Sequence, residues 1–423
     1  MQVNGPQPRD IAVVAIGGDI GVYAMCRAFH EAFGANSVVL STVSTRPMER
    51  SAFIENVVAP GLADDETLIK ALETQAERLA KPGRQLVLLT NSDWHVHTIA
   101  ANRERLEAAG YFFQYPTPEV LSEVSTKAGF AEVCSRLDIP TPGSVPVNIR
   151  ELVAGNGKPD DVAVPFAFPV IAKPSDSSQW QELSFSGKQK IHTLNNRQEL
   201  DELLGKLIEA NYPGVLLVQE YIPGDETQQR SMTAYRDSAG NVTLLASGRV
   251  LLEEHTPGTL GIPAAILTEP YEDAFEAATR FLNEVGYTGF ANFDFKRDSR
   301  DGRHVFFEVN PRIGRNNYYV TAAGANTAEV LVADVIDGAT TEVPRRADKE
   351  VLYTVIPFNL LQRYIVDPEL LARLKKVVAR GGLANPLKYK GGDSGLWRRL
   401  IVAGISLAYR RKYHQFYPKP LDG

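Results

Sequence analysis

Gly289-Phe-Ala-Asn-Phe-Asp-Phe-Lys296 runs through a polar turn into His304-Val-Phe-Phe-Glu-Val-Asn310-Pro-Arg-Ile-Gly314. Both arms are rich in phenylalanine and valine, and the charged segment 297–303 between them contains a glycine. This pattern predicts a β-hairpin. Asp294 then projects from one strand, and Glu308 and Asn310 share a face of the other, because side chains alternate along a strand.

These three side chains form a candidate metal site. Mg²⁺ prefers hard oxygen ligands in a partial set that leaves room for water and for the phosphate oxygens of a nucleotide. The alternative is an ordinary surface hairpin with solvated acids. Apolar residues flank both Asp294 and Glu308 and count against that alternative, since burying an unpaired charge is costly. The hairpin alone leaves the two interpretations balanced.

Composition describes an ordinary globular protein of two or three domains. The chain has 423 residues, 44% of them hydrophobic and 23% charged, and a formal net charge of −6 that gives no reason to expect nucleic-acid binding. Cys26 and Cys134 are the two cysteines, so we expect a reduced interior without disulfides. The first ten residues lack the apolar core of a signal peptide, and no apolar run is long enough to cross a bilayer. We therefore expect a cytoplasmic protein.

The N-terminal part predicts an open, parallel α/β domain. Apolar runs at 11–16, 38–40 and 86–89 read as buried strands, and amphipathic helices separate them. Gly17-Gly18 lacks the spacing of a dinucleotide fingerprint and suits a tight turn. Asn91 and Asp93 follow the third strand, where they either hold a small polar substrate or cap the next helix.

Further along the chain, five motifs occur in a fixed order. They are Lys127 in Ser-Thr-Lys-Ala-Gly-Phe, Lys173 in Val-Ile-Ala-Lys-Pro, Gln219-Glu220-Tyr221-Ile222 with Glu226 after a Pro-Gly turn, Asp294, and Glu308-Val-Asn310-Pro-Arg312. Behind an α/β domain, this series resembles the ATP-grasp superfamily of carboxylate–amine ligases. The segment 17–31 and most of the first 340 residues are similar to the peptidoglycan D-aspartate ligases.

The resemblance implies a fold, a cofactor and a role for each residue. The fold is an α/β domain (1–118), a two-subdomain ATP-grasp unit of α+β type (119–222 and 223–346) and a basic C-terminal extension (347–423). ATP would bind with one or two Mg²⁺ ions, for which Mn²⁺ could substitute. Lys127 and Lys173 would contact phosphates, Gln219 to Ile222 the adenine, and Glu226 the ribose. Asp294, Glu308 and Asn310 would hold the metal, and Arg312 would steady the transferred phosphoryl group.

One feature departs from the family pattern. The lid loop after Lys173 has no glycine between residues 175 and 179, whereas relatives place several there to cover the phosphates. We expect the hydroxyls of Ser175 and Ser178 to serve instead. Arg249 lies within a strand pattern, where it either clamps a substrate carboxylate, the role we favour, or forms a structural ion pair. Arg315, Asn316 and Asn317 are further substrate candidates, and His255 reads as a loop residue.

The implied reaction is amide formation through an acylphosphate. The subfamily resemblance implies D-aspartate as donor, activated at its β-carboxyl, and the third stem-peptide residue of a cell-wall precursor as acceptor. Alternatives are another ATP-grasp enzyme, such as a dipeptide ligase or a bicarbonate-using carboxylase, and a nucleotide-binding regulator without turnover. The oligomeric state stays open, with a homodimer among the options.

The C-terminal segment has a different character. Residues 388–419 contain eight Lys or Arg and a single acid, Asp393, and 396–413 reads as an apolar helix with basic ends. We favour a helix docked on the protein body with its basic ends in water. The alternatives are peripheral contact with anionic lipid and binding of a polyphosphate substrate.

Overall fold

The computed structural model describes residues 9–155, 157–175, 179–180, 183–189 and 191–418. They form two compact units. The first unit comprises residues 1–125, 225–295 and 308–423, and the second comprises 126–224 and 296–307. The four-part division expected from the sequence stays a prediction, and the described residues 347–418 belong to the first unit.

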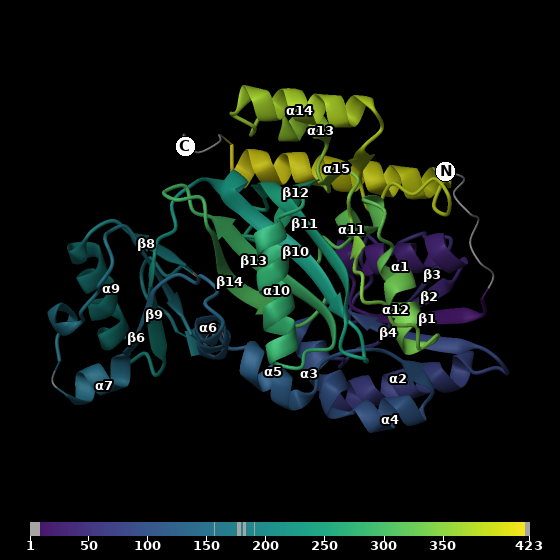
Figure 1. Ribbon diagram of the computed structural model, residues 1–423, viewed down its shortest axis with the longest axis horizontal. Coiled ribbons are helices and arrows are strands. Elements are labelled where there is room, and N and C mark those ends of the chain that lie inside the picture. The colour runs from purple at the N-terminus through teal and green to yellow at the C-terminus, as the bar shows by residue number, and fades with distance from the viewer. Residues whose placement is uncertain (1–8, 156, 176–178, 181–182, 190, 419–423) are drawn as a thin grey trace. The chain divides into compact units, whose positions relative to one another are not determined.

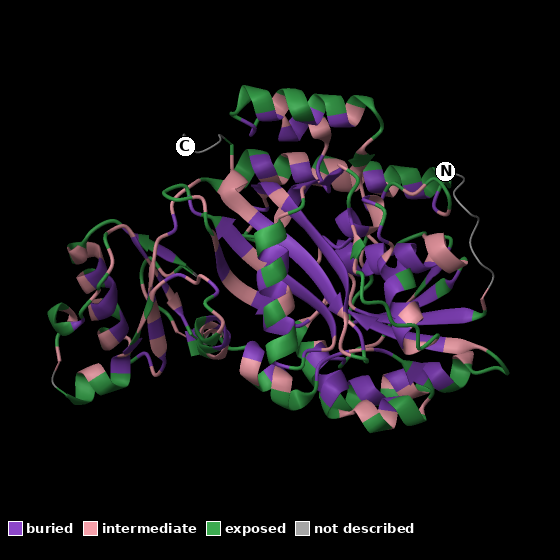
Figure 2. Cartoon of the chain, in the orientation of Figure 1, coloured by how far each residue is buried: buried purple, intermediate pink, exposed green. Residues whose placement is uncertain are grey.

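The first unit begins with the expected parallel sheet, which confirms the predicted fold class. Its strands run in the order β3-β2-β1-β4-β5. The register β1–β4 pairs Val14 with Leu88, and both side chains are buried in one hydrophobic cluster with residues of α2 and α3 (Figure 2). The elements are β1 (Ile11–Ile16), α1 (Ile20–Phe33), β2 (Asn36–Ser41), β3 (Ile54–Val58), α2 (Asp65–Leu79), β4 (Gln85–Thr90), α3 (Asp93–Ala101), α4 (Arg103–Ala108), β5 (Tyr111–Phe112) and α5 (Pro118–Val124).

A second, mostly antiparallel sheet completes the core of the first unit. Its order is β14-β13-β10-β11-β12-β16-β17, with β15 paired to β11, and α10 lies across one face of it (Figure 1). The edge pair β13–β14 is the hairpin expected from the sequence. The elements are η2 (Glu226–Gln228), β10 (Gln229–Arg236), β11 (Val242–Glu253), β12 (Pro263–Thr268), α10 (Glu272–Glu284), β13 (Gly289–Arg297), β14 (His304–Asn310), α11 (Tyr318–Ala322), α12 (Thr327–Val335), β15 (Arg345–Arg346), β16 (Leu352–Thr354) and β17 (Leu383–Ala384).

The C-terminal segment docks on this body, as the favoured interpretation predicts, but Arg398 at the basic start of its last helix is buried and not in water. It contains α13 (Phe358–Leu361), α14 (Pro368–Ala379) and the long helix α15 (Leu396–Phe416). Val402, Tyr409 and Tyr413 of α15 belong to the same hydrophobic cluster as the second sheet. None of the helices in the described ranges has the length and apolar character required to cross a bilayer.

The second unit is a small antiparallel sheet covered by helices. Its strand order is β6-β9-β7-β8, and leucines of α9 pack with Val170 and Val218 in its core. Its elements are α6 (Lys127–Arg136), β6 (Ser144–Asn148), α7 (Ile149–Ala154), η1 (Pro159–Asp161), β7 (Val170–Pro174), β8 (His192–Leu194), α9 (Arg197–Glu209) and β9 (Val215–Glu220). The hairpin tip, residues 296–307, also belongs to this unit.

Two predicted elements of this region are wrong. The sequence pattern predicts a single helix over 119–137, but the chain forms α5 and α6 instead, because the Thr126 side chain accepts a hydrogen bond from Gly129 N and caps a new helix. The pattern also predicts a strand over 185–191, but the described residues there form a turn at Gly187, and the strand is β8 instead. Phe185 stacks on His192, so packing rather than strand pairing uses its side chain.

Candidate active site

Asp294, Asn310 and Asn292 meet at the base of the β13–β14 hairpin. Asn310 Nδ2 donates to Asp294 Oδ2 at 3.0 Å, and Asn292 Nδ2 donates to Asp294 Oδ1 at 3.3 Å. Asn292 and Asp294 are two residues apart and therefore lie on the same face of β13. These side chains lie on the faces that the alternation along each strand predicts, and Asp294 and Asn310 are therefore in contact.

The surroundings of Asp294 disfavour its negative charge. Burial and, next, the negative charge of Glu308 raise the pKa of Asp294 from 3.8 to about 7, against a smaller opposing effect of Arg312. A bound cation would favour the ionised form of Asp294, because it offsets the repulsion from the Glu308 charge. No group of three or more His, Cys, Asp or Glu side chains is arranged around a metal position within the described ranges. Two carboxylates and an amide fit Mg²⁺, which keeps water and phosphate oxygens as its other ligands.

Arg312 is fixed beside these ligands by the turn after β14. Its backbone N–H donates to Asn310 O at 2.8 Å, and its Nη2 donates to Asn310 Oδ1 at 3.1 Å. Its Nε lies 3.1 Å from Asp93 Oδ1, at the first residue of α3. The guanidinium therefore joins the hairpin to the loop that follows the parallel strand β4.

A second charged cluster lies at the carboxyl edge of the parallel sheet. Asn91 Nδ2 donates to Asp19 Oδ1 at 3.0 Å, and Arg315 Nε lies 3.2 Å from Asp19 Oδ2. Arg315 Nη1 also pairs at 2.5 Å with Glu254, which is 1% exposed. A Cβ atom on Gly21 would lie 2.8 Å from the Arg315 backbone, so only glycine admits this approach of α1. The other two candidates are buried: Asn316 donates to Ser231 Oγ, and Asn317 donates to the carbonyls of Gly21 and Gly314.

Glu226 is held by the end of β11. Its Oε2 accepts from Glu253 N at 2.8 Å, and its Oε1 lies 2.7 Å from His255 Nε2. The His255 ring stacks on Tyr417, which follows α15. His255 lies in a loop, as expected, and fixes Glu226. A carboxylate has about four lone-pair sites, so Glu226 retains capacity for a ribose hydroxyl.

Arg249 does not meet the metal-site carboxylates. Its Nε and Nη2 donate to the carbonyl and hydroxyl oxygens of Thr227, at 2.9 and 3.1 Å. It pairs directly across β10–β11 with Arg230, whose guanidinium lies over the Tyr271 ring on the side of α10. The next residue of β10, Ser231, faces Asn292 and hence the side of Asp294. Arg249 therefore lies on the opposite face of the sheet from Asp294.

The second unit carries the predicted adenine segment at the end of β9. Gln219 Nε2 donates to Ser144 Oγ at 2.8 Å, and Glu220 Oε1 accepts from Arg300 at 2.6 Å. Lys296 Nζ donates to the carbonyls of Ile222 and Gly224, at 2.9 and 2.6 Å, and lies over the Tyr221 ring. Because the Ile222 carbonyl already accepts from Lys296, Ile222 would read a base edge through its N–H.

The two predicted phosphate-binding lysines come from neighbouring elements of the second unit. Lys127 is the first residue of α6, and its Nζ lies 3.4 Å from the carbonyl of Pro174, directly after Lys173. A helix N-terminus presents free N–H groups and a positive dipole end, which suit phosphate. Lys173 is half-buried in β7. Ser175 is exposed after this strand, whereas Ser178 lies outside the described residues.

No sequence motif marks three further residues of the site, which are Asn292, Lys296 and Arg300. Asn292 and Lys296 alternate with Asp294 along one strand, and that period-two pattern was the available signal. Arg300 lies in the hairpin turn that the sequence marks only as polar. Its partner Glu220 is 80 residues earlier, so no local pattern reveals the pair.

Comparisons with known sequences show the family to which the chain is related. The family model of the carbamoyl-phosphate synthase L chain, ATP binding domain, matches residues 127–324. A D-aspartate ligase of Enterococcus faecium (strain Aus0004) is 31% identical over 421 residues, which cover 98% of this chain and 99% of that protein. A carbamoyl phosphate synthase large chain of Archaeoglobus fulgidus is 25% identical over 239 residues, which cover 55% of this chain but only 21% of that protein.

Solved structures share the fold. The biotin carboxylase domain of the Hydrogenobacter thermophilus 2-oxoglutarate carboxylase, determined with MgADP and bicarbonate, gives a TM-score of 0.55 at 17% identity and covers 82% of this chain and 73% of its own. An N5-carboxyaminoimidazole synthetase from Staphylococcus aureus gives 0.53 at 15% identity and covers 81% and 80%. The predicted resemblance is confirmed at the level of the superfamily: this chain belongs to the ATP-grasp carboxylate–amine ligases.

Proposed function

We propose that this chain is an ATP- and Mg²⁺-dependent ligase that attaches D-aspartate, through its β-carboxyl group, to an amine of a peptidoglycan precursor in the cytoplasm. The acceptor is the side-chain amine of the third residue of the stem peptide. The observation that carries the choice of donor is the similarity to the E. faecium D-aspartate ligase, which extends over both chains almost completely. The grouping of Asp294, Glu308 and Asn310 supports the use of a metal nucleotide.

The reaction has two steps. An oxygen of the β-carboxylate attacks the γ-phosphorus of ATP, which gives an acylphosphate and ADP. The acceptor amine then attacks the acyl carbon and loses a proton, the amide bond forms, and inorganic phosphate leaves. Positioning and charge neutralisation supply most of the rate enhancement in such transfers.

Residues of the first unit serve the transferred group. Asp294, Glu308 and Asn310 hold Mg²⁺, which neutralises phosphate charge when bound. Arg312 is kept in place by Asn310 and Asp93 and steadies the phosphoryl group as its bonds change. Glu226, oriented by Glu253 N and His255, accepts the ribose hydroxyls.

Residues of the second unit serve the base and the phosphates. Gln219, Glu220 and the backbone of Tyr221 and Ile222 bind the adenine edge. Lys127 and Lys173 neutralise the α- and β-phosphates. Lys127 does so from the first turn of α6, where the helix dipole adds to its charge. Ser175 and Ser178 contribute hydroxyl donors in place of the glycines of other lids.

The amino acid needs a site with both signs of charge, because free D-aspartate carries two carboxylates and an ammonium group. The cluster at the carboxyl edge of the parallel sheet offers such a set: Asp19 and Asp93 for the ammonium, and Arg315 with Asn91 for a carboxylate. Parallel α/β sheets collect ligands at this edge.

A donor screen tests the proposal without the acceptor. ADP formation is measured with ATP, Mg²⁺ and hydroxylamine as a generic amine, in the presence of D-aspartate, L-aspartate, D-glutamate or bicarbonate. We expect D-aspartate to trigger ADP and hydroxamate formation. ADP release with bicarbonate would identify a carboxylase, and tight ATP binding without donor-dependent turnover would identify a regulator. Either result contradicts the proposal.

The metal assignment is tested separately. Asp294→Asn and Glu308→Gln each remove one charged ligand, and we expect the donor-dependent rate to fall by roughly a hundredfold or more with little change in the far-ultraviolet circular dichroism. The exposed Asp348→Asn is the control and should retain the parent rate. Near-parent activity in both site variants would refute the role given to the hairpin.

A further inference from the structure

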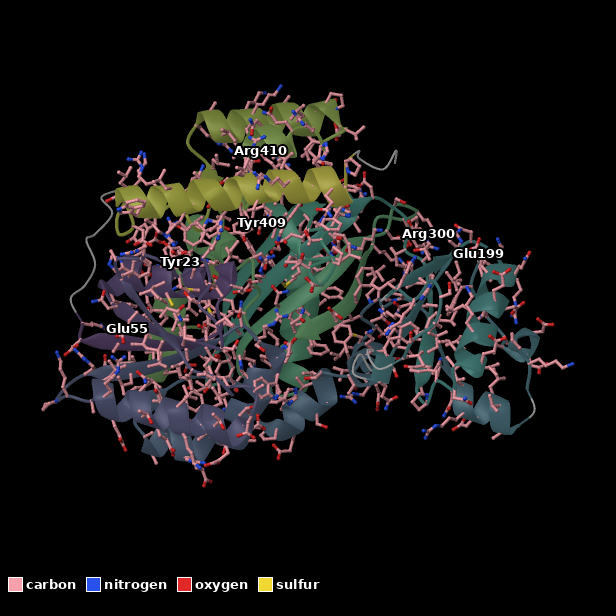
Figure 3. All side chains as sticks on the ribbon, turned by 180° about the vertical axis from the view of Figure 1, so that it is seen from behind. Tyr23, Glu55, Glu199, Arg300, Tyr409 and Arg410 are labelled. Atoms are coloured by element: carbon pink, nitrogen blue, oxygen red, sulfur yellow. The ribbon has the colours of Figure 1, made fainter. Side chains whose placement is uncertain are left out.

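Helix α15 has two apolar faces, and only one of them is used by the fold. Val402, Tyr409 and Tyr413 are buried against the body. Tyr409 and Arg410 point to different sides of the helix (Figure 3). On the far side, Leu396, Leu400 and Leu407 remain 69%, 53% and 50% exposed. With the exposed Ala403, these leucines are spaced i, i+4, i+7 and i+11 and form one stripe, hereafter the outer stripe.

Cations flank the outer stripe on both sides. A helical projection at 100° per residue places Arg399 and Arg410 on one flank and Arg411 on the other. Trp397, 71% exposed, lies on the same flank as Arg411. Tryptophan favours the boundary between water and lipid, where its ring is half immersed.

The segment around the helix is positively charged, like the flanks of the outer stripe. Between residues 388 and 418 the only acid is Asp393, which is fully buried against Arg398. The exposed or half-exposed charges of this segment are therefore all positive: Lys388, Lys390, Arg399, Arg410, Arg411 and Lys412. This segment is therefore strongly positive, although the whole chain has a net charge of −6.

A groove lies along one flank of the outer stripe. It has a volume of about 730 Å³ and is lined by apolar residues that include Leu387 and Val402, by Lys388, Lys390, Arg399 and Arg410, and by the single acid Asp393. An apolar lining with four cations and one acid suits an amphiphile with an anionic headgroup. Two such faces would repel each other, so the charge opposes self-association through this surface.

We propose that the outer stripe and its cationic flanks dock α15 on the surface of a membrane that contains anionic phospholipids. The leucines and Trp397 enter the headgroup boundary, and the arginines and lysines pair with lipid phosphates. The buried face of α15 keeps its contacts with the body throughout. This inference is independent of the donor and acceptor proposed above.

Vesicle co-sedimentation of the full chain tests it. We expect binding to vesicles of phosphatidylglycerol and phosphatidylcholine that weakens with added salt, and much less binding to phosphatidylcholine alone. Leu396→Gln with Leu400→Gln should lower the partition coefficient roughly tenfold or more. Arg399→Gln with Arg411→Gln should lower it roughly fivefold per arginine. Val343→Gln, at a residue 77% exposed outside this segment, is the matched control and should change nothing.

Three results would overturn the proposal. The first is absence of binding to anionic vesicles at low salt. The second is binding that survives both double substitutions. The third is a change in the oligomeric state of the free chain on substituting the stripe, which would assign the surface to a second copy. All variants should keep the parent rate of donor-dependent ADP formation, so failure here is distinguishable from failure of the proposed ligase reaction.

Discussion

The surroundings of Asp294 favour its neutral form below about pH 7. Its pKa lies at about 7 rather than 3.8, chiefly because of burial and the nearby Glu308. Between these two pH values the unfolded chain has released the proton that the folded chain retains. The stability that depends on this proton is complete below pH 4 and is lost as pH rises toward 7. The ionised carboxylate therefore lowers the stability of the folded chain at neutral pH, and the proposed Mg²⁺ would offset this loss.

This residue gives the first prediction. In the presence of a chelator, Asp294→Asn should be more stable than the parent, and the difference in unfolding free energy should widen by up to roughly 3 kcal/mol between pH 5 and pH 8. Urea denaturation at both pH values measures it. Asp348→Asn should follow the parent curve, and a constant difference for Asp294→Asn would show that Asp294 ionises as in the unfolded chain.

Lys296 gives the second prediction, within the second unit. Its buried ammonium group donates to the carbonyls of Ile222 and Gly224, so Lys296→Met leaves both without this donor. We expect a loss of stability of about 1–3 kcal/mol and roughly tenfold weaker ATP binding by calorimetry. Lys206→Met, at an exposed position on α9, is the control. Unchanged ATP affinity would show that Lys296 does not support ATP binding by the adenine segment.

At the scale of elements, the hairpin was predictable and the helices around residue 126 were not. Phenylalanines and valines define both arms of the hairpin, and the period of two along each strand places Asp294 and Asn310 where they can meet. The break between α5 and α6 depends on one hydroxyl, that of Thr126, which competes with a continuous apolar periodicity. The sequence could not predict on which face of the sheet Arg249 lies, because β10 and β11 are buried on both faces and show no alternation of polar and apolar residues.

Two glycines on helices should respond to substitution in opposite ways. Gly21 on α1 touches the Arg315 backbone, so Gly21→Ala should displace the turn that holds Arg312 and Arg315, lower stability by about 1–3 kcal/mol and reduce activity. Gly205 on α9 has open space, so Gly205→Ala should raise stability by about 0.5–1 kcal/mol. Thermal unfolding and ADP release compare the two. Equal effects would mean that helix propensity alone governs both positions.

At the scale of the whole chain, a buried ion pair fastens the start of α15 to helix α1 and to the loop before β3. Asp393 accepts from Tyr23 at 2.8 Å and from Ala52 N at 2.6 Å, and lies 3.2 Å from Arg398 Nε. Arg398 is 2% exposed, and its guanidinium lies over the Tyr23 ring. The sequence marked this segment as basic but gave no sign of a buried pair, because its partners lie more than 300 residues away.

Removing one member of the pair should cost far more than removing both. Asp393→Ala leaves Arg398 buried and uncompensated, and we expect a loss of about 3–5 kcal/mol. The double variant Asp393→Ala with Arg398→Met should recover part of this loss, because methionine fills similar space without charge. Chemical denaturation measures the coupling. Additive losses would show that the two side chains act independently.

Helix α15 also has a bearing on how the protein is made. Tyr409 donates to the buried Glu254, which precedes it by 155 residues, and Tyr413 donates to the carbonyl of Glu253. A nascent chain still on the ribosome therefore exposes the Glu254 carboxylate until its final helix has been synthesised. Shortened products that lack α15 would leave this carboxylate uncovered and would be more open to proteolysis.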